Sequence, residues 1–90
     1  MLAMSNIPAF SASDLGKILR AERKKLGFTQ QHLAMLAGCR RETIIEAESG
    51  GNVSIYTLMG ILGGLGKGLS ICDTHIEFDQ LSQIFGDDND

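Results

Sequence analysis

The chain has 90 residues, a formal net charge of −3 and 43% hydrophobic residues. This length predicts one small domain, and no apolar run reaches the roughly 18 residues that a membrane-spanning helix needs. Two cysteines, Cys39 and Cys72, are too few for a disulfide framework and lack the spacing of a zinc site, so we expect reduced thiols in a cytoplasmic protein.

Charge is distributed unevenly along the chain. Seven of the eight Lys and Arg residues lie between positions 17 and 41, where Glu22 is the only acid, whereas six acids and no Lys or Arg occur from position 73 onward. Surface charges are screened within about 8 Å at physiological salt. The basic segment is therefore able to attract a polyanion although the whole chain is acidic.

The predicted helices begin after residues 1–11, which have no clear period and are expected to form a flexible N-terminal arm. Ser11 or Ser13 is predicted to cap a first helix, and Gly27 is predicted to end it. The buried stripe of this helix is expected to contain Leu15, Ile18, Leu19 and Leu26.

A second and a third helix follow with only a short turn between them. Thr29 is predicted to cap the second helix, QQHLAMLA, and Gly38 to end it. The inner positions of the second helix are expected to be Leu33, Leu36 and Ala37. The third helix begins at Arg40 or Arg41. Two helices joined by a few residues with a glycine in the turn are typical of a helix-turn-helix motif.

A fourth helix and a short strand are predicted to follow the loop at residues 50–52. Ser54 caps the fourth helix, whose expected inner positions are Ile55, Leu58, Ile61, Leu62 and Leu65. After Lys67, the alternation of apolar and polar residues predicts a strand made of Leu69, Ser70, Ile71 and Cys72. A strand needs a partner, which is either a second copy of the chain or a hairpin strand that contains Ile76 and Phe78.

The C-terminal residues 79–90 are acidic and contain three apolar side chains at helical spacing, Leu81, Ile84 and Phe85. Two interpretations of this tail remain open. It is either a helix that docks on a partner protein or a disordered end.

Three stretches together resemble the Xre/Cro/cI family of helix-turn-helix repressors: RKKLGFTQQHLAMLAG (23–38), TIIEAESG (43–50) and SIYTLMGILGGLG (54–66). The resemblance implies an all-α, lambda-repressor-like DNA-binding fold of four to five helices, with the helix-turn-helix domain over residues 12–66. It also implies that Glu48 pairs with Arg23 and ties the third helix to the first.

The stretch LGKGLSICDTH (65–75) narrows the resemblance to HipB-type antitoxins. In that subfamily a β-strand follows the fourth helix and pairs with its copy across a two-fold axis. The resemblance thus implies a homodimer joined through residues 67–78, which binds double-stranded operator DNA with inverted half-sites and a HipA-like kinase toxin. It implies no cofactor and no membrane partner.

The resemblance also assigns the residues that contact DNA, because the third helix of such proteins enters the major groove. Those expected at the bases are Arg40, Arg41, Glu42, Ile45 and Glu46. Those expected at the phosphates are Thr29, Gln30, Gln31, Thr43, Gly51 and Asn52. The planar fork of arginine matches guanine O6 and N7, whereas a carboxylate accepts from cytosine N4.

Two residues of the third helix depart from the family pattern, Arg40 and Ile45. A small polar residue is common where Ile45 stands, and Ile45 either meets a thymine methyl group or is simply exposed. The family usually has Ser or Thr as the cap where Arg40 stands. Arginine does not cap a helix, so we hypothesise that the cap was given up for a DNA contact. For Glu42 and Glu46 two interpretations stay open: they accept from cytosine, or they hold the arginines at a fixed angle.

Three functions are consistent with these patterns. The first is a dimeric repressor that is also the antitoxin of a kinase, and the second is a phage-type repressor without a toxin. The third is an interaction protein that neutralises a partner and has little affinity for DNA. We expect no enzyme activity, since the sequence offers neither a nucleophile with its base, nor paired carboxylates, nor a metal cluster.

Overall fold

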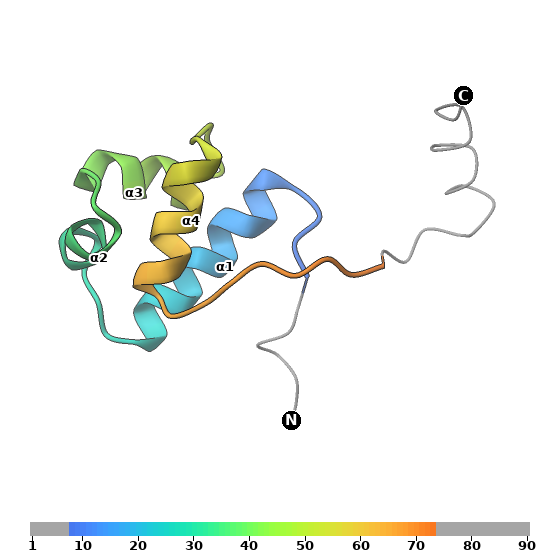
Figure 1. Ribbon diagram of the computed structural model, residues 1–90, viewed down its shortest axis with the longest axis horizontal. Coiled ribbons are helices and arrows are strands. Elements are labelled where there is room, and N and C mark those ends of the chain that lie inside the picture. Colours follow the sequence, from blue (N-terminus) through green and yellow to red (C-terminus); the bar gives the residue numbers. More distant parts are fainter. Residues whose placement is uncertain (1–7, 74–90) are drawn as a thin grey trace.

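The computed structural model of the chain describes residues 8–73 and contains four helices in that range (Figure 1). They are α1 (Ala12–Lys25), α2 (Gln30–Ala37), α3 (Arg41–Glu48) and α4 (Ile55–Gly64). The predicted all-α class is therefore confirmed. A fifth helix, a hairpin through Ile76 and Phe78, and the apolar tail residues Leu81, Ile84 and Phe85 lie outside the described residues.

Three of the four described helices begin where a short hydroxyl side chain replaces a missing backbone acceptor. The side-chain oxygens of Ser11, Thr29 and Ser54 each accept a hydrogen bond of 3.0 Å from the backbone N–H three residues later. Such a bond satisfies one of the free N–H groups of the first turn. The three capping positions predicted from the sequence, with Ser11 chosen over Ser13, are thus confirmed.

The core is formed where all four helices meet. Each helix contributes one large, fully buried side chain to it, namely Leu19, Leu33, Ile44 and Ile61. Ala34, Ala47, Leu62 and Leu65 complete the buried cluster. An eight-residue apolar cluster of this kind fits the small core that the length predicts.

Three apolar residues predicted to be inside are exposed: Leu26 by 46%, Leu36 by 48% and Ile55 by 73%. Leu26 follows the last residue of α1, and Ile55 is the first residue of α4, so both lie beyond the part of their helix that crosses the core. At 3.6 residues per turn, Leu36 points roughly 100° away from the middle of the buried side of α2.

Two glycines allow helices to approach one another through their backbones. A Cβ atom on Gly16 of α1 would lie 2.6 Å from the carbonyl oxygen of Glu48, at the end of α3. A Cβ atom on Gly60 of α4 would lie 2.9 Å from the carbonyl oxygen of Ala37, at the end of α2. Glycine is unfavourable inside a helix, and the close approach to Ala37 explains why α4 has a glycine at position 60. A Cβ atom on Gly63 would instead meet open space.

The segment after α4 returns toward α1 (Figure 1). The backbone N–H of Lys67 donates to Leu62 at 2.8 Å, and its ammonium group lies 3.5 Å from Glu22. Burial acts to raise the pKa of Glu22, but Lys25 and Lys67 outweigh it, so this pKa lies below its usual value. An open groove of about 720 Å³ lies between the segment and α1.

Residues 69–72 are exposed and have no strand partner within the described part of the single chain. A β-ladder requires a second strand, so the pairing of Leu69, Ser70, Ile71 and Cys72 with another copy stays a prediction. Between residues 8 and 73, none of the helices has both the length and the apolar character needed to cross a membrane.

Candidate nucleic-acid interface

Residues 38–40 join α2 to α3, and these two helices with their turn form the α2–α3 unit. Gly38 adopts the left-handed conformation (φ 74°), which a side chain would disfavour. The N–H of Cys39 then donates to the carbonyl of Ala34 at 3.0 Å and closes the turn. Because Leu33, Ala34 and Ile44 are fully buried, the two helices pack on the same core and are held as one unit.

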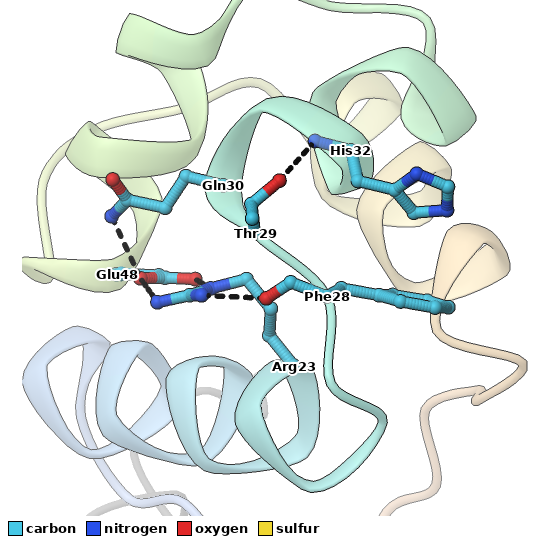
Figure 2. A network of polar contacts seen from close by, with 6 residues as sticks. All are labelled: Arg23, Phe28, Thr29, Gln30, His32 and Glu48. Carbon is cyan, nitrogen blue, oxygen red and sulfur yellow. Dashed lines mark hydrogen bonds and ion pairs between the residues drawn. The ribbon is translucent and has the colours of Figure 1, made fainter.

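A buried ion pair fixes this unit to α1 (Figure 2). Arg23 donates from Nε to Glu48 Oε2 at 2.6 Å and from Nη2 to Glu48 Oε1 at 3.1 Å. Its Nη1 donates to the carbonyl of Phe28 at 2.8 Å. Arg23 is only 7% exposed. The expected pair is thus present, and it links the last turn of α1, the following loop and the end of α3.

Gln30 belongs to the same network, a role that the sequence does not predict. Its side-chain amide donates to Glu48 Oε1 at 3.1 Å (Figure 2). The side chain expected at a phosphate is therefore half-buried and also structural, although its backbone N–H still lies in the first turn of α2. No sequence signal distinguishes this contact from an exposed glutamine.

The outer face of α3 carries all the side chains expected at the bases. Ile44 and Ala47 are buried, whereas the remaining set is exposed: Arg40, Arg41, Glu42, Ile45 and Glu46. Ile45 is 39% exposed, so the face combines charged groups with one apolar side chain. Within the described residues, Arg40 and Arg41 form no ion pair and are available to a ligand.

The start of α3 lacks the side-chain cap that the other three helices have. Arg40 has extended backbone angles (φ −89°, ψ 158°) and makes no capping hydrogen bond. The departure seen in the sequence is therefore a departure in the structure. Arg40 directly precedes the uncapped N–H groups of the first turn of α3, and its positive charge and these N–H groups both favour an anion.

The residues expected at the phosphates lie at the two borders of α3. Thr29 and Gln31 are exposed at the start of α2, and the Thr29 hydroxyl accepts from the N–H of His32 as a cap. Gly51 and Asn52 lie in the loop after α3. An open hollow of about 290 Å³ joins α3, this loop and α4, and it is lined by Glu42, Thr43, Glu46, Asn52, Val53, Ser54 and Thr57.

Helix α1 carries four further exposed cations, Lys17, Arg20, Lys24 and Lys25. No group of three or more His, Cys, Asp or Glu side chains in the described range is placed to hold a metal ion. Burial raises the pKa of the Cys39 thiol, so less of it is present as the nucleophilic thiolate at neutral pH. The arrangement suits the binding of a polyanion.

Comparisons with known proteins agree with this geometry. The model of a family described as Helix-turn-helix matches residues 19–71. No protein among curated sequences matches the chain. The chain is similar to the restriction-modification controller protein C.AhdI from Aeromonas hydrophila, with 29% identity and a TM-score of 0.60 over 63% of this chain and 84% of that chain.

Two further solved structures are similar to it. One is a HipB variant in the HipB-O2 20mer complex, with 28% identity and a TM-score of 0.69 over 74% of this chain and 94% of that chain. The other is a chain of the HipA-HipB-O2-O3 complex, with 29% identity and a TM-score of 0.70 over 76% of this chain and 97% of that chain.

Proposed function

Because this chain belongs to the helix-turn-helix family of DNA-binding regulators, of the Xre/Cro type, we propose that it is a sequence-specific repressor of its own operon. It binds operator DNA as a cytoplasmic homodimer and is the antitoxin of a HipA-like kinase. The observation that carries the proposal is the outer face of α3, which presents Arg40 and Arg41 from a rigid, buried base.

The dimensions of α3 support its entry into the major groove. A helix with its side chains is about 10–12 Å across, and the major groove of B-DNA is about 12 Å wide. Arg41 is the first residue of α3 and is exposed. In a helix-turn-helix motif the second helix of the pair, here α3, reaches the base edges with its first residues. Arg41 therefore reads a guanine, and Arg40 contacts the adjacent phosphate or base.

The phosphate contacts come from both sides of α3. The N-terminus of α2 offers free N–H groups together with Thr29, Gln30 and Gln31. The loop after α3 offers Gly51 and Asn52, and Thr43 lies half-buried beside it. The exposed cations of α1 add a field that is independent of sequence and sensitive to salt.

Residues 12–66 form the DNA-binding domain, and residues 67–78 are the dimer region. In the dimer, the strand Leu69–Cys72 pairs with its copy. A two-fold dimer reads inverted half-sites about 34 Å apart or a multiple of that spacing. Support for the toxin comes from the likeness to a chain of a complex that contains HipA, HipB and DNA. The tail residues Leu81, Ile84 and Phe85 are then candidates for docking on the kinase.

Fluorescence anisotropy with duplex DNA from the region upstream of the gene tests the repressor function. Wild type is expected to bind one duplex tightly, with an affinity that falls steeply with salt. Arg41→Ala should lose about 1–3 kcal/mol on that duplex and little on scrambled DNA. Arg20→Ala, an exposed arginine on α1, is the matched control and should weaken both duplexes equally. Equal, weak binding of every duplex by all three proteins would refute the repressor function.

The antitoxin function has a separate test. The chain and a HipA-like kinase from the same operon are mixed and passed over a size-exclusion column. Co-elution together with inhibition of the kinase is expected. Operator binding without co-elution would leave a phage-type repressor, whereas co-elution without operator binding would leave an interaction protein.

A further inference from the structure

Glu42 and Glu46 lie one turn apart on the outer face of α3, but the structure places them differently. Ile44 and Ala47 define the middle of the buried side of α3. The centre of the outer face is the point directly opposite, and Glu42 lies within about 10° of it around the helix axis. Glu46 lies about 50° to one side of that centre, on the border next to the α3–α4 loop. Neither carboxylate has an ion-pair partner among residues 8–73.

Glu46 is packed against that loop. A Cβ atom built on Gly51 would overlap the carboxylate of Glu46 and lie 2.8 Å from its Cγ. Gly51 does not adopt a positive φ, and the atoms that a side chain at this position would meet belong to the exposed Glu46 side chain, which would have to move aside. The N–H of Gly51 also donates to the main-chain carbonyl of Glu46 at 2.8 Å. The Glu46 side chain thus lies over the first turn of the loop, and its main-chain carbonyl is bonded to that turn.

The electrostatic surroundings of the two carboxylates differ as well. Glu42 is in the first turn of α3, where the helix dipole stabilises a negative charge, and it follows directly after Arg40 and Arg41. Glu46 is in the second half of α3 and has neither advantage. A carboxylate that enters a groove lined by phosphates needs positive charge near it, and only Glu42 has that charge.

The position of each residue decides what it meets on DNA. A helix that enters the major groove by its N-terminus turns its first-turn residues and the centre of its outer face to the base edges, and the borders of its later turns to the phosphates. From this we infer that Glu42 is a specificity-determining residue that selects a cytosine by accepting from its N4 amino group, and that Glu46 is a positioning residue of the α3–α4 loop that reads no base. The inference rests on the proposed function and deepens it.

The inferred half-site contains a cytosine next to the base pair that Arg41 reads, since the two residues are adjacent at the start of α3. Adenine also offers an amino group in the major groove, but its N7 acceptor repels a carboxylate. Glutamine matches both groups of adenine. Glu42→Gln should therefore change the preferred base from cytosine to adenine at a single position.

The test is a selection from a duplex library with randomised half-sites, carried out with wild type, Glu42→Gln and Glu46→Gln. Single duplexes are then measured by anisotropy, and circular dichroism verifies that each variant is folded. At the selected position, Glu42→Gln is expected to lose about fivefold to tenfold in affinity for cytosine relative to adenine. Glu46→Gln is expected to keep every base preference of the wild type and to bind all duplexes about threefold more tightly, because one repulsion with phosphate is removed.

Two results would overturn the inference alone. One is that Glu42→Gln selects the same sequence as the wild type, and the other is that Glu46→Gln shows a new base preference. A wild-type protein that enriches no sequence would overturn the repressor function, and the inference with it. The two failures are therefore distinguishable in one experiment.

Discussion

The substitution Glu48→Ala is expected to remove a large part of the stability of this domain. Glu48 accepts from two nitrogens of Arg23 and from the amide of Gln30, and its side chain is only 5% exposed. Without it, the guanidinium group of Arg23 stays buried with the carbonyl of Phe28 as its remaining acceptor. Removing one member of a buried pair costs about 3–5 kcal/mol, out of about 5–13 kcal/mol for a chain of this size.

Urea and thermal denaturation followed by circular dichroism measure this loss. At about 4–8 °C per kcal/mol, the melting temperature of Glu48→Ala should fall by roughly 12–40 °C. The exposed Glu42 on the same helix supplies the control, since Glu42→Ala should change the free energy of unfolding by less than about 1 kcal/mol. The double variant Arg23→Met with Glu48→Leu removes both charges and should recover much of the loss.

The reasoning would be refuted by a loss below about 1 kcal/mol in Glu48→Ala with an unchanged urea dependence. It would also fail if the double variant were as unstable as Glu48→Ala, because the cost would then come from lost packing and not from an unpaired charge.

Two further substitutions test other contacts. Gly16→Ala should destabilise the domain by more than about 2 kcal/mol, because its methyl group would lie 2.6 Å from the carbonyl oxygen of Glu48. Gly63→Ala is the control, since open space surrounds this position, and it should stabilise the domain by up to about 1 kcal/mol. Equal effects of the two substitutions in thermal melts would contradict the close approach at Gly16. Arg40→Ser should raise the free energy of unfolding by about 1 kcal/mol by restoring a helix cap and should weaken operator binding; unchanged anisotropy would show that Arg40 makes no DNA contact.

The parts of the fold that were predictable from the sequence depend on local chemistry. Ser11, Thr29 and Ser54 start helices through bonds to an N–H only three residues away, and Gly38 ends one through its own backbone conformation. Such features need no knowledge of the rest of the chain. The Arg23–Glu48 pair spans 25 residues and was expected only through the family resemblance.

The parts that were wrong or missed depend on packing between elements. Apolar periodicity assigns Ile55 to the inner side of α4, but it does not reveal that the core begins one turn later. The contact of Gln30 with Glu48 joins two residues whose proximity follows from how α2 and α3 cross. The base contacts remain predictions, since they concern a partner and not the chain itself.

The division of α3 into a buried and an exposed side has a consequence for how such a protein diversifies. Ile44, Ala47 and Glu48 hold the helix in place, whereas Arg41 and Glu42 make no contact on which the fold depends. The residues at the exposed positions can therefore change without loss of stability. A duplicated gene is able to acquire a new DNA target in this way while its protein keeps the same fold. The same separation makes these two positions the natural starting point for reprogramming the protein in the laboratory.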